Sequence, residues 1–159
     1  MTSLIKKVIL PAILAVAVAA PLTAQEQPIE LAGDVKLAVV TTDDSGQTTT
    51  SYVAPEKVVP GDRLLFTTNF RNSGAELVEN FAVTNPLPGA VQLASDADPA
   101  LLVSVDGGTT WGQLDGLAVA LEDGSSRAAT HSDVTHVRWT LASVQPGESG
   151  RVEYPAIVR

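Results

Sequence analysis

The sequence predicts an all-β domain, an antiparallel sandwich or barrel, behind an N-terminal signal peptide. Short segments of alternating apolar and polar residues recur after the first 34 residues, with turn residues between them at intervals of about 8 to 12 residues. No stretch beyond residue 24 carries apolar residues at i, i+3, i+4 and i+7 over three turns, so we expect essentially no helix there. The chain has no cysteine, and an exported fold of this kind must therefore depend on its apolar core rather than on disulfides.

The first 24 residues have the order of a secretory signal peptide. The Lys6-Lys7 pair gives a positive start, residues 8–20 are almost purely apolar, and small residues lead to Ala24. A membrane-spanning helix is the weaker alternative, because the apolar run is about thirteen residues long and roughly 20 are needed. We expect cleavage after Ala24, since a cut after Ala20 would leave Pro21 at the start of the product.

Cleavage would leave a polar segment at residues 25–34 and one domain at residues 35–159. The whole chain carries a formal charge of −8, and loss of Lys6-Lys7 leaves 8 basic against 18 acidic residues, or −10. Such an acidic chain is a poor ligand for nucleic acid or anionic lipid. We therefore expect no nucleic-acid partner, no stable membrane insertion after cleavage, and a product in the periplasm, at the cell surface or outside the cell.

The strand that organises the domain is expected within residues 58–76. A Pro60-Gly61 turn precedes it and the Asn72-Ser73-Gly74 turn follows it, because proline and glycine supply turn dihedrals that other residues resist. Between these turns the side chains alternate with the period of a half-buried strand. The residues expected on its inward face are Leu64, Phe66, Thr68 and Phe70.

Further strands are expected along the rest of the domain. They cover residues 35–40, 77–84, 90–94, 101–105, 109–114, 117–121, 134–141 and 151–159. Residues 41–51 are expected to form a loop or a weak edge strand, and residues 122–132 a polar loop. Pro155 marks the last strand as an edge strand or a bulged one. The expected shared core consists of Phe66, Phe70, Val137, Trp139, Leu141, Val152 and Tyr154.

The order of these turns and strands resembles a known bacterial family. A Pro-Gly-Asp turn, an Asn-x-Gly turn, a Leu-Pro-Gly strand end, a strand centred on tryptophan and a Pro-Gly-Glu turn follow one another from about Val58 to Arg159. This is similar to the conserved-repeat, immunoglobulin-like domain of bacterial surface and secreted proteins, called domain of unknown function number eleven. The resemblance extends back to Val35 and implies a single immunoglobulin-like antiparallel β-sandwich in an envelope setting, with no activity attached. The family is commonly repeated in tandem, whereas this chain has one copy, which argues against a stalk-like spacer.

One segment looks like a catalytic motif but is expected to be structural. Residues 104–111 follow the pattern S-x-D-x-G-x-T-W, which is similar to the Asp-box hairpin of sialidases and other propeller proteins. A propeller needs several copies at a fixed period, and there is one. We expect Asp106 to accept backbone N–H bonds in a turn completed by Gly108, and so to bring Trp111 onto the sheet.

The remaining candidates for chemistry are few. His131 and His136 are five positions apart, so on an extended chain they point to opposite faces and cannot easily share a metal; His131 and Asp133 could share a face. Asp96 and Asp98 could hold calcium, but a solvated turn is the better interpretation. We expect no catalytic residue, no metal ligand and no cofactor.

The sequence therefore favours an exported, non-enzymatic structural or interaction module of the bacterial cell envelope, with an unknown envelope protein or glycan as partner. Two alternatives stay open. Trp111 and Tyr52 are the aromatic residues expected to be exposed, and such a pair could form the platform of a carbohydrate-binding module. A hydrolase with an unrecognised site is the second alternative.

Overall fold

The fold is described by a computed structural model for residues 28–159, a part of the chain that contains no helix long and apolar enough to span a membrane. The expected signal peptide lies outside these residues. The elements are β1 (Ile29–Thr42), β2 (Thr48–Val53), β3 (Arg63–Asn72), β4 (Val78–Pro86), β5 (Val91–Leu93), β6 (Leu102–Ser104), the 3-10 helix η1 (Leu114–Gly116), β7 (Ala118–Ala120), β8 (Ser126–Ala128), the 3-10 helix η2 (His131–Asp133), β9 (His136–Val144) and β10 (Ser149–Val158).

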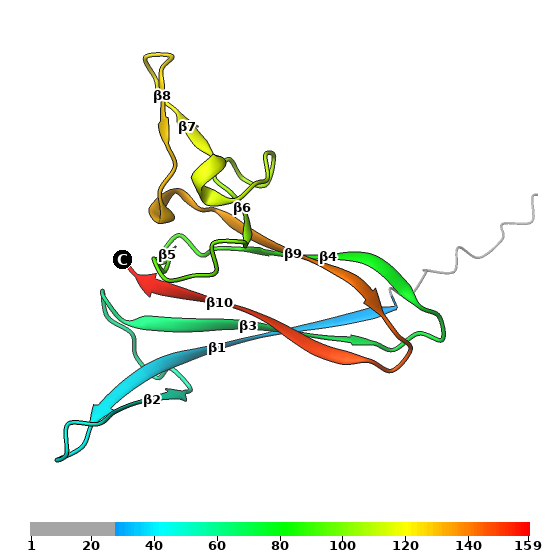
Figure 1. The fold of residues 1–159 in the computed structure, drawn as a ribbon, viewed down its shortest axis with the longest axis horizontal. Helices are drawn as coiled ribbons and strands as arrows, with labels where there is room; N and C mark the ends of the chain where they lie inside the picture. Colours follow the sequence, from blue (N-terminus) through cyan, green and yellow to red (C-terminus); the bar gives the residue numbers. More distant parts are fainter. Residues whose placement is uncertain (1–27) are drawn as a thin grey trace, which may run out of the picture.

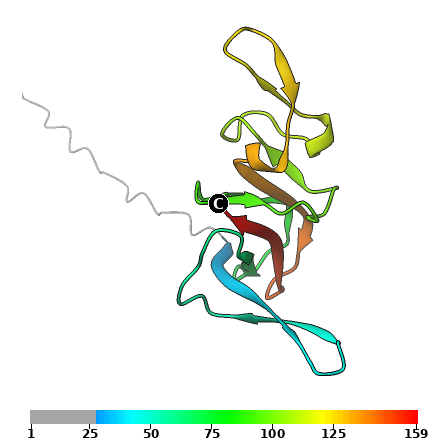
Figure 2. The same cartoon turned by 90° about the vertical axis from the view of Figure 1, so that its left-hand side faces the viewer.

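Two antiparallel sheets pack against each other (Figure 1), which confirms the expected all-β fold as a β-sandwich-like arrangement. The larger sheet has the order β2-β1-β3-β10-β5 and the smaller one β4-β9-β6. Strands β7 and β8 form a separate ribbon. Two views show this ribbon and the β1–β2 hairpin projecting from opposite sides of the body (Figures 1 and 2).

Strand β3 is the centre of the larger sheet, as its alternation predicted. Phe66 pairs with Val35 of β1 on one side and with Tyr154 of β10 on the other. The rings of Phe66 and Tyr154 stack with centroids 4.9 Å apart, and the ring of Trp139 lies 6.1 Å from that of Tyr154. Because Trp139 belongs to β9 of the smaller sheet, these three rings join the two sheets. Burial also raises the pKa of Tyr154 to about 12.

The buried core is mostly aliphatic. Of the seven residues expected to share it, Val137 and Tyr154 are buried, and Phe66 and Trp139 are half-buried against the main cluster. Phe70, Leu141 and Val152 are also half-buried but lie outside that cluster. Phe70 instead covers Gly150, where any Cβ would collide with its ring.

Asn72 is a completely buried amide at the end of β3. Its Nδ2 donates to the carbonyl oxygens of Glu76 at 2.8 Å and Val144 at 2.9 Å, and its Oδ1 accepts the N–H of Gly74 at 2.9 Å. Its backbone N–H and C=O both bond to the β9–β10 turn at residues 147–148. One residue therefore fastens the β3–β4 turn, the end of β9 and the β9–β10 turn to one another.

Strand β1 begins at Ile29 rather than at Val35, so most of the polar segment expected before the domain belongs to a strand. Ile29 is buried and pairs with Asn72. The alternation was hard to recognise because Gly33 interrupts the inward row and contributes no side chain to it.

Residues 109–114 do not form the expected strand. A single bridge joins Val103 of β6 to Gly112, and the chain then turns into η1. The reason is local: the bonds to Asp106 described below hold the chain bent as far as Thr110.

Residues 122–132, expected to be a polar loop, contain β8 and the start of η2. Every residue of β8 is exposed, so its sequence has no apolar alternation, and pairing with β7 alone defines it as a strand. The Asp133 carboxylate accepts the N–H and the hydroxyl of Thr130 at the start of η2, and it also accepts hydrogen bonds from both terminal nitrogens of Arg127 at 2.7 Å. The Arg127 guanidinium holds the pKa of Asp133 well below its usual range.

Pro155 lies where β10 changes from an edge strand to an interior one, so the expectation of an edge holds for residues 149–154 and not for those that follow. Strand β10 pairs with β3 from Ser149 to Ile157 and with β5 from Ala156 onward. The Pro155 carbonyl accepts the N–H of Ala94, so it points to the β5 side of the strand. The N–H and C=O of a strand residue point to the same side, so the N–H that proline lacks would also have pointed there, just beyond the end of β5. The acceptor that such an N–H would have met is the carbonyl of Ala94, and this carbonyl accepts the N–H of Ala97. Proline at position 155 therefore leaves no acceptor unpaired there.

We predict that Asn72→Ala lowers the free energy of unfolding by about 2 to 4 kcal/mol, because it removes the partner of the buried Val144 carbonyl and of two partly buried groups, the Glu76 carbonyl and the Gly74 N–H. Urea unfolding followed by tryptophan fluorescence measures this. The control is Asn69→Ala on the exposed side of the same strand, expected to cost less than about 0.5 kcal/mol. Equal losses in the two variants would contradict the role given to Asn72.

Candidate functional site

The Asp106 carboxylate is the one carboxylate of residues 104–111, and it accepts several hydrogen bonds within its own turn. Its Oδ1 accepts the N–H groups of Thr109 at 3.1 Å and Thr110 at 2.9 Å, and the hydroxyl of Ser104 at 2.7 Å. The bonds expected from the sequence are therefore present. The N–H of Thr110, then the side chain of Thr110, then the Ser104 hydroxyl hold the pKa of Asp106 well below its usual range.

The tip of this turn needs glycine. Gly107 and Gly108 have φ of 77° and 90°, the left-handed region that other residues resist. The N–H of Gly108 donates to the buried Ser104 hydroxyl at 2.9 Å, and the carbonyl of Gly108 accepts Trp111 Nε1 at 2.8 Å. The turn thus fixes the position of the Trp111 ring.

Trp111 is half-buried rather than freely exposed. The guanidinium carbon of Arg138 lies 3.6 Å from the ring centroid and so covers one face, and His136 meets the ring edge-on with centroids 6.3 Å apart. Arg138 is held in place by a 3.0 Å bond from its Nε to the Thr84 hydroxyl. One face of this ring is therefore already occupied by the protein's own side chain.

Tyr52 lies elsewhere. It sits on β2 at the edge of the larger sheet and is 46% exposed, whereas Trp111 follows β6 of the smaller sheet. The two views place the β1–β2 hairpin and the segment around residue 110 on opposite sides of the body (Figures 1 and 2). The structure does not bring the two aromatics together into one sugar platform.

The histidines and acidic residues named above are also separated or engaged. His131 belongs to η2 and His136 to β9, where it packs on Trp111. Asp96 forms a two-bond ion pair with Arg63 at 2.8 and 3.0 Å, which holds the pKa of Asp96 down, and Asp98 accepts the N–H of Ala100. In residues 28–159 no group of three or more His, Asp or Glu side chains is placed to hold a metal ion.

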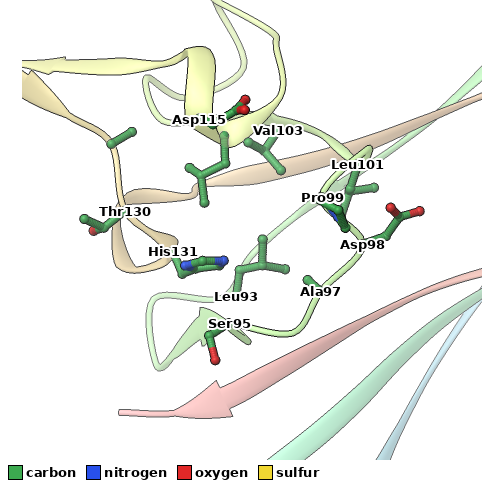
Figure 3. Close-up of a pocket in the computed structure, with 12 residues that line it drawn as sticks. Leu93, Ser95, Ala97, Asp98, Pro99, Leu101, Val103, Asp115, Thr130 and His131 are labelled. Carbon is green, nitrogen blue, oxygen red and sulfur yellow. The ribbon is translucent and has the colours of Figure 1, made fainter.

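A pocket of about 450 Å³ lies where the sheets meet η1 and η2 (Figure 3). Leu93, Leu101 and Val103 give it an apolar floor, and Thr130 and His131 lie at its polar side. Sequence patterns could not indicate this pocket, because its lining comes from segments that are distant along the chain.

The sheet edges differ in how well they are protected. At the end of β4, the N–H of Leu87 bonds to the carbonyl of Thr135, so the backbone of Leu87 points toward β9 and that of Pro86 points to the free edge, where proline has no N–H to donate. Earlier in the same strand, Asn80 interrupts the edge with a φ of 53°. The edge of β6 is covered by Gly112, which exchanges two backbone bonds with Val103. Strand β5 has three residues.

Strand β2 has none of these protections. It is six residues long, every residue is exposed, and it contains neither proline nor charge. Residues 29–36 of β1 and 149–154 of β10 also lack a partner on one side, but both stretches carry charged side chains. Within residues 28–159, β2 is therefore the one edge of the two main sheets that offers a continuous, uncharged row of backbone groups. Proteins normally blunt such an edge, since it is a template for pairing with another strand.

Comparison of the chain with protein-family models, with curated proteins and with solved structures finds no match in any of the three. The function is accordingly inferred from the residues and their geometry.

We predict that Asp106→Ala lowers the urea midpoint at pH 7 and that Asp106→Asn, which keeps an acceptor oxygen, lowers it less. A carboxylate whose pKa is depressed on folding stabilises the fold above its unfolded pKa of about 3.9, and loses that effect as the pH falls toward its folded pKa. The difference between wild type and Asp106→Ala should therefore shrink below about pH 4. An undiminished difference at low pH would contradict the role of the charge.

Proposed function

We propose that the chain is an exported, non-enzymatic interaction module of the bacterial cell envelope, built as an immunoglobulin-like sandwich. The observation that carries the proposal is the unprotected edge of β2, through which a partner strand can extend the larger sheet. Main-chain hydrogen bonds would supply affinity in this mode, and the side chains beside the edge would supply specificity.

The resemblance to the bacterial surface domain gains support from Asn72. The Asn-x-Gly turn and the Pro-Gly-Glu turn are distant in sequence, yet the backbone N–H and C=O of Asn72 bond to residues 147–148. Two of the turn motifs that carry the resemblance are thus hydrogen-bonded to each other through Asn72. This supports a shared fold, and the envelope setting follows from it by analogy.

The backbone groups available at β2 follow from the pairing with β1. The N–H of Asp43 donates to the carbonyl of Gln47, and the carbonyl of Thr49 accepts the Thr41 hydroxyl, so odd-numbered residues turn their backbone groups toward β1. In an antiparallel ladder the alternate residues point the other way. The residues with outward N–H and C=O groups are therefore Thr48, Thr50 and Tyr52.

Site-specific photo-crosslinking in the producing cell tests the edge. We expect p-benzoylphenylalanine in place of Tyr52 to form a covalent adduct with a protein partner. The matched control is the same probe in place of Ala82, an exposed residue on the protected edge of β4. If Tyr52 gives no more adduct than Ala82, β2 is not an interaction edge and the proposed function fails.

Export is tested separately. The proposal predicts that protein recovered from its own cell begins near Gln25 and is found outside the cytoplasm, because residues 1–24 have the order of a cleaved signal. Mass spectrometry of the intact protein from each cell fraction measures both. An intact Met1 in the cytoplasmic fraction would contradict the prediction.

A further inference from the structure

We propose that the strand received by the β2 edge is β2 of a second copy of this chain, in an antiparallel pair about a two-fold axis. This inference rests on the proposed function and names its partner. It follows from three properties of the edge: its backbone direction, its side chains and its lack of charge.

The backbone of β2 can pair with itself. Two antiparallel copies exchange hydrogen bonds when residues with outward N–H and C=O groups stand opposite each other. Centring the axis on Thr50 places Thr50 opposite its own copy and Thr48 opposite Tyr52 of the other, so all three outward residues find partners. A shift of one strand by one residue would place the outward N–H and C=O groups of one copy opposite residues whose backbone groups point toward β1. Such a shift would lose the hydrogen bonds between the copies, so only registers that differ by an even number of residues can form.

The side chains that meet in this register are compatible. On one face of the hairpin, Thr48, Thr50 and Tyr52 lie beside Ala38 and Val40 of β1. Val40 is 61% exposed and Tyr52 is 46% exposed, so apolar surface remains uncovered next to the edge. Thr–Thr and Thr–Tyr pairs across an antiparallel ladder are favourable, and the second copy would cover this surface.

Charge allows two copies to approach at this edge. The whole chain carries a formal charge of −8, which opposes self-association in general. Residues 45–55, however, contain no charged side chain, so the paired strands bring no like charges directly opposite each other. The remaining long-range repulsion is screened by salt, and the pair should therefore become tighter as ionic strength rises.

The symmetry closes the assembly. A two-fold β2–β2 pair uses the same edge of both copies. The unpaired sides that remain are the three-residue β5, residues 149–154 of β10 beside it and residues 29–36 of β1, and both longer stretches carry charged residues. A closed pair whose outer edges are short or charged does not continue into a fibre. The geometry thus gives a dimer rather than an open polymer.

Sedimentation of the purified protein over a range of concentrations and salt tests the inference. We expect a monomer that converts to a dimer as concentration rises, and more dimer at higher salt. Thr50→Pro removes only an outward N–H and leaves the pairing with β1 intact, so it should remain monomeric with an unchanged far-UV spectrum. The matched control Thr50→Val keeps the N–H and should dimerise as wild type does.

A second measurement addresses the register. The chain has no cysteine, so Thr50→Cys introduces one thiol, which a short bis-maleimide should link to its copy across the hydrogen-bonded pair, whereas Thr41→Cys on the neighbouring strand lies farther from the axis and should not be linked. A wild-type protein that is monomeric throughout overturns the inference, as does a dimer that persists in Thr50→Pro. If the photo-crosslinked adduct at Tyr52 contains a different protein, the second-copy inference fails and the proposed function stands; absence of any adduct removes both.

Discussion

The buried amide of Asn72 is the constraint on which the arrangement of the two sheets depends. It ends the central strand of the larger sheet and bonds the carbonyl of Val144, the last residue of β9 in the smaller sheet. An aliphatic residue has no polar atom for the Glu76 and Val144 carbonyls or the Gly74 N–H, and the bond to Val144 is buried while the other two are partly buried. The aromatic contact of Trp139 with Tyr154 then holds the sheets together farther along.

Periodicity and turn residues were enough to predict the central strand and the all-β fold, because Leu64, Phe66, Thr68 and Phe70 recur at every second position of β3 and both its turns contain glycine. The same signals failed where tertiary contacts decide the structure. Strand β8 exists through its pairing with β7, and Pro155 is tolerated inside a sheet because β5 ends beside it. Neither feature can be predicted from the residues next to it in the sequence.

The candidate sites divide in the same way. The bonds of Asp106 could be predicted since they are made within four residues of it. The cover over Trp111 could not, because Arg138 comes from β9, and the pocket beside His131 combines still more distant segments. The edge of β2 could be singled out only by comparison with the others, because β4 is interrupted, β5 is short, β6 is covered, and the open stretches of β1 and β10 are charged.

The order of strands around β3 also affects how soon the domain can fold. Its neighbours are β1, which precedes it, and β10, which ends the chain; Thr67 of β3 and its bonded partner Glu153 are 86 residues apart. Contacts of such sequence separation form slowly, since a long loop must close first. The central strand cannot be completed until the last segment has been synthesised. A chain built in this way stays unfolded for longer after its synthesis, and that is the state which the proposed export would require.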